Sequence, residues 1–157
     1  MITLQKLTVK DAYRLDDEDP ILVRLADEYS QVIHKFVHHA ELQGVFVVED
    51  DNRFAGVITR TDLLDWARAK LGAFFLKPLA NTDKTIRLVN LINASTAGDV
   101  LRPDTKKAAV IANDTLAHAL QMMIEADLIV LPVIDESQHI IGSLTLSEVL
   151  NLALAKS

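Results

Sequence analysis

Two threonine–carboxylate pairs are the residues of this sequence best suited to chemistry. Thr59 precedes Asp62 by three positions, and Thr145 precedes Glu148 by the same spacing. Each pair stands where an apolar run gives way to helical spacing, so both carboxylates are expected in the first turn of a helix. A threonine at a helix N-terminus lies among free backbone amides, which favour anionic groups. The plainer alternative is that the two acids only stabilise the helix start.

Other groups with chemical potential have plainer explanations. His34 and His38 stand four positions apart and could hold a metal on one helical face. No Glu follows His34, as a metalloprotease helix would require, so we interpret both, with His39, as a surface trio. The acidic run at residues 16–19 lacks the alternating spacing of a calcium loop. It is expected to be a solvated turn.

No catalytic arrangement is recognisable in the sequence. The chain has no Gly-x-Ser-x-Gly nucleophile elbow, no phosphate-cradling glycine loop and no glycine-rich dinucleotide turn. Trp66, from its helical position, is expected in a core or an interface. We therefore predict a protein that is not an enzyme, with no catalytic and no metal-ligating residues. A small hydrolase that uses His34 or the acidic run is the weakest alternative.

The two threonine–carboxylate pairs belong to an internal repeat. Residues 45–64 and 131–150 align without a gap at an offset of 86. Each copy has an apolar run, a polar turn and a second apolar run that opens at a glycine, which is a β-hairpin pattern. Thr61 and Ser147 are then predicted as helix N-caps. Upstream, residues 8–12 resemble residues 96–100 at an offset of 88, so the first copy has two additional residues.

Further elements are predicted around each hairpin. Residues 21–25 and 109–111 have the character of matching strands. Helical spacing follows in both copies and gives each helix one apolar stripe. The stripe positions are Val32, Ile33, Phe36 and Val37 in the first copy, and Leu116, Ala119, Leu120, Met123 and Ile124 in the second.

The repeat predicts the fold class and the domain organisation. A unit of about sixty residues would be only marginally stable alone, whereas two paired units bury a shared face. We expect an α/β fold of the α+β type, with two β-α-β-β-α units packed as a pseudo-two-fold pair. The first unit is predicted at residues 1–71 and the second at 96–157, joined by a partly helical connector at 72–95.

Length, charge and cysteine content restrict the class of protein. The chain has 157 residues, of which 16 are basic and 22 acidic, a net charge of −6, and no cysteine. Nucleic acid is not expected as a partner, because duplex binding needs a clustered basic face. No apolar run approaches the roughly 18 residues of a membrane span, and the start of the chain is unlike a signal peptide. The absence of cysteine favours a cytoplasmic location.

The repeated pattern resembles the cystathionine β-synthase (CBS) domain, and the tandem copy resembles a Bateman module. The resemblance is carried by residues 10–12 and 98–100, by the strand at 131–135, and by the two segments that run from a glycine through a threonine to an acid. Each piece is weak alone, but two copies in matched order are specific. The resemblance covers nearly the whole chain outside the connector.

The resemblance implies a regulatory module that binds AMP, ADP, ATP, S-adenosylmethionine or a related adenosyl compound in clefts between the two units. In such modules the acid takes the ribose hydroxyls, which is a charge-assisted contact, and the threonine lies near the phosphates. Apolar residues of the opposite unit hold the base. Carried onto this chain, the ligand-binding positions are Gly56, Ile58, Thr59, Arg60, Asp62, Ala108, Val110, Leu128, Gly142, Thr145 and Glu148.

Departures from the family pattern make the two clefts unequal. Glu148 stands where an aspartate is usual, and its additional methylene would crowd the ribose. The first copy has Phe46 where the second has Pro132. Arg60 is the basic residue best placed by sequence to meet a phosphate. The sequence therefore favours the Asp62 cleft as the binding site and predicts that the other cleft is empty or altered.

The function expected from the sequence is that of a sensor. Ligand binding would change how the two units, or the two chains of a homodimer, pack against each other. The regulated target would be an unidentified effector protein, and no obligatory cofactor is expected. The alternative is a CBS pair that has lost its ligand and acts as a dimerisation or docking module.

Overall fold

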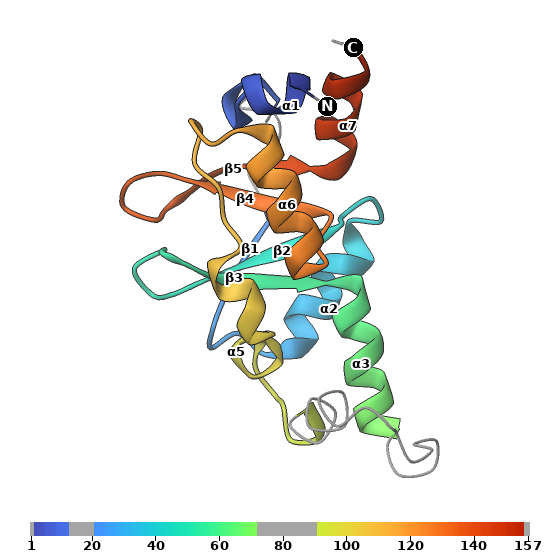
Figure 1. Cartoon of the computed structure of the whole chain (residues 1–157). Coiled ribbons are helices and arrows are strands. Elements are labelled where there is room, and N and C mark those ends of the chain that lie inside the picture. Colours follow the sequence, from blue (N-terminus) through green and yellow to red (C-terminus); the bar gives the residue numbers. More distant parts are fainter. Residues whose placement is uncertain (1, 13–20, 72–90, 156–157) are drawn as a thin grey trace.

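The computed structural model describes residues 2–12, 21–71 and 91–155, with side chains described from Leu4 onward. Two units of mixed helix and strand stack on one another (Figure 1). The fold is of the predicted α+β class. The predicted acidic turn at 16–19 and most of the predicted connector, residues 72–90, lie outside the described residues.

The first unit is a three-stranded sheet with two helices. Within it, β1 runs parallel to β2, and β2 pairs antiparallel with β3 through the hairpin. A parallel pair needs a long crossover, which the intervening helix provides. The elements are β1 (Leu22–Arg24), α2 (Tyr29–His38), β2 (Gly44–Val48), β3 (Phe54–Thr59) and α3 (Arg60–Leu71).

The second unit repeats this order with a shorter sheet. The strand predicted at 109–111 is reduced to a single parallel bridge between Val110 and Val133. The amide of Val110 still donates to the Pro132 carbonyl at 3.0 Å, so the chain follows the predicted path. The regular elements are α6 (Leu116–Ala126), β4 (Val130–Ile134), β5 (Ile140–Thr145) and α7 (Leu146–Ala155).

Both hairpin turns have the same backbone conformation, which explains why the repeat aligns there without a gap. Asn52 and Gln138, equivalent at the offset of 86, have positive φ values of 68° and 66°. Asparagine adopts this left-handed conformation more readily than glutamine. The two turns also meet, because Phe54 N donates to the Gln138 carbonyl at 2.9 Å and Arg53 bridges to His139.

The two sheets share an apolar layer. β2 is buried along its whole length, and its successive side chains point to opposite faces. Phe46 belongs to a core cluster with Leu131 and Val133 of the second unit. Val45 and Val47 pack instead with the buried side of α2. Each unit thus supplies part of the core of the other, as the small size of one repeat requires.

The apolar stripes of α2 and α6 are narrower than the sequence predicts. Phe36 and Met123 are buried as expected, but Val37 and Ile124 are 70% and 72% exposed. Each of these follows a buried residue of the stripe, Phe36 or Met123, by one position, which is about 100° around the helix. The prediction was therefore wrong for Val37 and Ile124. Trp66 packs on the core, with its ring centroid 5.2 Å from that of Tyr29.

The segment that precedes each unit packs on the other unit. We call residues 2–12 the first arm; it holds α1 (Ile2–Lys6) and the 3₁₀ helix η1 (Val9–Asp11). α1 lies against α6 (Figure 1). Leu116 N, at the start of α6, donates to the Leu7 carbonyl at 2.9 Å. The first arm therefore completes the second unit.

Residues 94–102, which we call the second arm, complete the first unit in the same way. The arm holds α5 (Ala97–Val100), which contacts β1 and α2. Tyr29 N, at the start of α2, donates to the Ser95 carbonyl at 2.9 Å. Gly98 N donates to the Leu25 carbonyl, and a Cβ on Gly98 would lie only 3.2 Å from that oxygen. The two units are therefore interlocked through their arms.

Candidate functional site

Asp62 is buried in the first turn of α3. Its Oδ2 accepts hydrogen bonds from the backbone amide of Thr59 at 2.9 Å and from the Thr59 hydroxyl at 3.2 Å. Because α3 begins at Arg60, Thr59 and not Thr61 flanks the helix start. Only 2% of the Asp62 side chain is exposed. The predicted pair is thus assembled as a tight local cap.

Arg102 of the second arm lies over the Asp62 carboxylate. Its Nε is 3.5 Å from Asp62 Oδ1, and 21% of its side chain is exposed. Its Nη2 donates to the Ala126 carbonyl at the end of α6 at 3.2 Å, and its Nη1 lies 3.7 Å from Asp104. Arg102 therefore connects the two units at this cleft. Arg14, its counterpart at the offset of 88, lies outside the described residues.

The same cleft is covered by the 3₁₀ helix η3 (Pro103–Lys107), which packs on β3. Val57 N donates to the hydroxyl of the buried Thr105 at 3.3 Å. A Cβ on Gly56 would lie 2.7 Å from Leu101 Cδ2, so any other residue here would have to displace the end of the Leu101 side chain. Arg102, Leu101 and Thr105 occupy the space beside the Asp62 pair.

The Thr145–Glu148 pair has the same local structure. Glu148 Oε1 accepts from the Thr145 amide at 3.0 Å and from the Thr145 hydroxyl at 2.8 Å. The Thr145 hydroxyl in turn accepts from Glu148 N at 3.2 Å, which is a capping box. α7 begins at Leu146, so the cap is Thr145 and not Ser147. The longer acid forms this cap, and its carboxylate is half-buried.

A cavity of about 200 Å³ lies beside Thr145, between the two units. Its wall from the first unit includes Leu42, which is the counterpart of Leu128 at the offset of 86. The sequence could have located this wall by applying the repeat offset to the lining predicted for the other cleft. The lining residues are Ile21, His39, Glu41, Leu42, Gln43, Gly44, Phe46, Val130, Ser143 and Thr145.

The residues predicted to line the Asp62 cleft are core residues. Ala108, Val110 and Leu128 are each at most 3% exposed and belong to the cluster shared by the two sheets. Ile58 is fully buried but packs in the other cluster, with α2. Its side chain therefore faces away from the second unit. Gly142 is buried in β5 opposite Val133.

Arg60 does not face the Asp62 carboxylate. Its guanidinium donates to four carbonyl oxygens around the end of α2, those of Phe36, His39, Ala40 and Leu42, at 2.9–3.3 Å. It also lies 5.1 Å from the centroid of the Phe36 ring. Two of these carbonyls belong to residues that line the Thr145 cavity. Arg60 therefore braces the wall of the opposite cleft.

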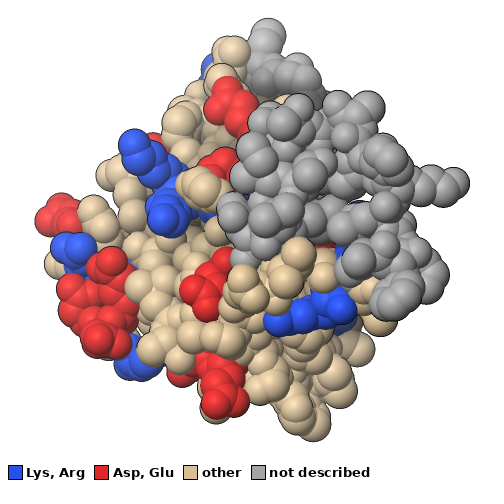
Figure 2. All heavy atoms as spheres, turned by 90° about the horizontal axis from the view of Figure 1, so that it is seen from below, with Lys and Arg blue, Asp and Glu red and all other residues tan. Residues whose placement is uncertain are grey.

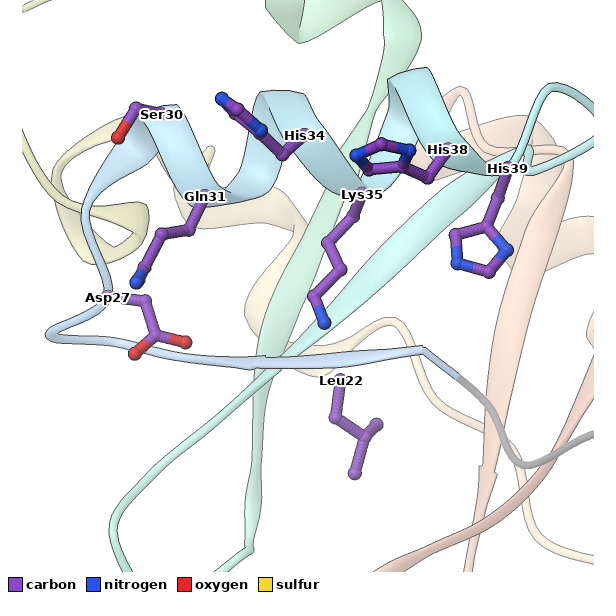
Figure 3. Close-up of a pocket in the computed structure, with 8 residues that line it drawn as sticks. All are labelled: Leu22, Asp27, Ser30, Gln31, His34, Lys35, His38 and His39. Carbon is purple, nitrogen blue, oxygen red and sulfur yellow. The ribbon is translucent and has the colours of Figure 1, made fainter.

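A second cavity, of about 500 Å³, follows the polar side of α2 (Figure 3). His34, Lys35 and His38 line it, and His39 lines both this cavity and the one beside Thr145. The rings of His34 and His38 are 6.2 Å apart between centroids. No group of three or more metal-ligating side chains occurs in the described residues.

The face of the molecule seen from below carries charges of both signs (Figure 2). In the view from below, lysine and arginine side chains lie scattered among acidic ones (Figure 2). Within residues 2–12, 21–71 and 91–155, no helix is long and apolar enough to cross a membrane.

Two interlocked β-α-β-β-α units with a threonine–acid cap at each interunit cleft define a tandem CBS pair. The sequence model of the CBS domain family matches residues 9–69 and 97–155. The chain belongs to the CBS domain family. No curated protein sequence matches it.

Three solved structures with the same fold contain CBS domains in chains of similar length. CBSX2 in complex with AMP has a TM-score of 0.72 at 22% identity, covering 95% of this chain and 97% of that chain; CBSX2 is from Arabidopsis thaliana. A CBS domain-containing protein from Thermotoga maritima has a TM-score of 0.71 at 25% identity, covering 96% of both chains. The CBS pair of protein MJ0100, in complex with 5′-methylthioadenosine and S-adenosyl-L-methionine, has a TM-score of 0.65 at 16% identity, covering 96% and 98%.

Proposed function

We propose that this chain is a regulatory module that binds an adenosine-type ligand between its two units, and that it is not an enzyme. The observation that carries the proposal is the cavity beside Thr145, which lies between the units and against a threonine–carboxylate cap. Adenosyl ligands in CBSX2 and in MJ0100 support the choice of ligand class. AMP, ADP, ATP and S-adenosylmethionine are the candidates.

The groups around this cavity match the parts of a nucleoside. Leu42, Phe46 and Val130 provide apolar contact for a base. Glu148 is not among the described residues that line the cavity, but Thr145, which lines it, holds the Glu148 carboxylate through two hydrogen bonds. In a wider cleft this carboxylate would accept from the vicinal hydroxyls of ribose. This cleft is our preferred site because a cavity adjoins its threonine, although the sequence favoured the cleft at Asp62.

The size of the cavity points to how binding would be transmitted. Ligand pockets measure roughly 300–1,000 Å³, whereas this cavity measures about 200 Å³. An adenosyl ligand must therefore widen the cleft. Because the two sides of the cleft come from different units, a ligand that prefers the wider cleft shifts the packing of the units.

The ligand-bound module would act on another polypeptide from within a homodimer in the cytoplasm. Homodimerisation is supported by large apolar side chains that remain exposed on helices of both units. Such side chains are common at interfaces between subunits. They are Val37 on α2, Leu64 and Leu71 on α3, Ile124 on α6, and Leu150 and Leu154 on α7.

Thermal denaturation with AMP, ADP, ATP and S-adenosylmethionine tests the proposal. At least one ligand should raise the melting temperature, since a ligand bound only by the folded state stabilises it. Glu148→Ala should weaken that ligand at least tenfold, while Asp65→Ala, which removes an acid of α3 outside the clefts, should not. Absence of any shift at millimolar ligand would favour the alternative, a docking module without a ligand.

A further inference from the structure

The Asp62 cleft contains a cation that the sequence does not reveal. The Arg102 guanidinium is held by a carboxylate of each unit and by the carbonyl that ends α6: Asp62 at 3.5 Å, Asp104 at 3.7 Å and Ala126 at 3.2 Å. Asp62 is 2% exposed and Arg102 21% exposed. The ion pair is thus largely shielded from water, where removal of one partner is costly.

A ribose in this cleft must compete with Arg102. If the ribose hydroxyls take Asp62 Oδ1, the guanidinium loses its buried anionic partner and keeps only Asp104, which is 52% exposed. An uncharged nucleoside offers nothing to replace that partner. A sulfonium ligand adds a second cation. A nucleoside phosphate supplies an anion, and arginine binds phosphate through paired, charge-assisted hydrogen bonds.

Arg60, the residue that the sequence favoured for a phosphate, is unsuited to this exchange. Its guanidinium is held by four carbonyl oxygens around the end of α2. Arg102 is instead held by one hydrogen bond and two ion pairs longer than 3.4 Å. Of these two arginines, Arg102 is the one that can release its partners and turn to a ligand.

We propose that Arg102 gates the Asp62 cleft and makes it selective for nucleoside phosphates over uncharged or sulfonium adenosyl compounds. This proposal rests on the proposed function. In the free protein, Arg102 pairs with Asp62. In the complex, the ribose hydroxyls take Asp62 and the phosphate takes Arg102. Because Arg102 connects Asp62 of the first unit to Ala126 of the second, the exchange of partners also changes a contact between the units.

The test follows the Thr59 backbone amide in ¹H–¹⁵N spectra of the full chain, titrated with AMP and with adenosine. This amide donates to Asp62 and so reports directly on the Asp62 carboxylate, while the Thr145 amide, which donates to Glu148, reports on the other cleft. We expect AMP to bind there at least tenfold more tightly than adenosine. In Arg102→Gln the preference should fall to about one, because AMP loses its cation while adenosine no longer displaces one.

Two further variants separate charge from packing. Arg102→Lys keeps the cation and should keep much of the preference for AMP. Arg68→Gln, on the exposed side of α3, should behave as the wild type. An unchanged ratio of affinities in Arg102→Gln would overturn the gate. So would ligand shifts confined to the Thr145 amide, although the proposed function would then stand. If no resonance of the wild type or of Arg102→Gln responded to either ligand, the gate would fall, and the proposed function would be restricted to ADP, ATP and S-adenosylmethionine.

Discussion

At the residue scale, one local motif occurs in two different surroundings. Thr59–Asp62 and Thr145–Glu148 form the same hydrogen bonds within each repeat. Among the described residues, Arg102 covers the first pair and a cavity adjoins the second, whereas Arg14, the counterpart of Arg102, lies outside those residues. Local sequence therefore specifies the cap, and the partner unit decides whether a ligand can reach it.

Arg60 shows how a residue can support a site from outside it. We predict that Arg60→Ala lowers the free energy of unfolding by about 1–2 kcal/mol, because the carbonyls around the end of α2 lose a charged donor. The side chain is exposed, which keeps the loss below that of a buried group. Urea denaturation measures the change.

Arg53→Ala is the matched control for Arg60. Arg53 forms ion pairs with Glu49 and Asp51 in which all three side chains are 43% exposed or more, and exposed pairs contribute little to stability. Its loss should stay within about 0.5 kcal/mol. Equal effects of the two substitutions would show that Arg60 does not brace the loop.

At the element scale, the two arms, each of which packs on the opposite unit, are the elements that hold the two repeats together. Each arm carries a Thr-x-x-Asp turn in which the acid accepts from the amide of the threonine, Thr8 with Asp11 and Thr96 with Asp99. The amide of Ser95 also donates to Asp99. These turns shape the arm so that its carbonyls reach the first amides of the opposite unit's helix.

Asp99 gives the second arm a dependence on pH. The backbone amide of Ser95 and then that of Thr96 hold the pKa of Asp99 below its ordinary value of 3.8. A carboxyl whose folded pKa is depressed stabilises the fold above its unfolded pKa and loses this contribution as the pH falls through the folded value. Asp99→Asn should therefore cost roughly 0.5–1 kcal/mol at pH 7, and the difference should shrink as the pH falls through the folded pKa of Asp99, which lies below 3.8.

Urea midpoints of the wild type and Asp99→Asn between pH 2 and pH 7 measure this dependence. Asp50→Asn, a change in the exposed turn between β2 and β3, is the control and should stay within about 0.5 kcal/mol at neutral pH. A difference between Asp99→Asn and the wild type that is constant over the whole range would contradict the role of the charge.

At the scale of the whole molecule, the pair is asymmetric although its sequence repeats. The first sheet has three strands and the second has two with a bridge. Among the described residues, η3 and Arg102 pack at the Asp62 cleft, and a cavity adjoins Thr145. We expect such a module to respond in two steps, with the Thr145 cleft filling before the Asp62 cleft.

We predict that the chain sediments at twice its mass of 17.4 kDa. The exposed leucines of α3 and α7 would be buried between two copies, so the combined change Leu64→Lys and Leu154→Lys should yield monomers, because it places charges in an apolar interface. Ile111→Lys, which replaces an exposed apolar residue outside the helices, should leave the dimer intact. Sedimentation of the wild type at 17.4 kDa would contradict homodimerisation.

Much of this fold could be predicted because the repeat carries local signals. The hairpins follow from alternating runs and matched turns, which end in the equivalent residues Asn52 and Gln138. The helix starts follow from Thr59 and Thr145, each two residues before the predicted caps Thr61 and Ser147. Val37 and Ile124 were misplaced because periodicity fixes the centre of an apolar stripe better than its edges.

The remaining features depend on contacts between distant parts of the chain. Arg102 has no local pattern that links it to Asp62, forty residues earlier. The sequence shows the charge of Arg60 but not its contacts with the carbonyls around the end of α2. Its interpretation as a phosphate ligand therefore rested on charge alone. The sequence repeat does not show that each arm packs on the opposite unit. Residues 8–12 and 96–100 would resemble each other equally well if each packed on its own unit.

The interlocked arms also constrain how the chain can be made. A ribosome adds roughly 5–20 residues per second, so the first unit emerges seconds before Ser95 and Gly98, which complete the start of its α2 and the end of its β1. During that interval β2, which is buried on both faces in the finished protein, has only one face covered. At this stage, two chains being synthesised on one messenger RNA can form a domain-swapped dimer, in which the second arm of each chain packs on the first unit of the other. The arm contacts that hold the two repeats together can therefore form within one chain or between two chains. Which of these forms depends on how soon the second arm is synthesised after the first unit.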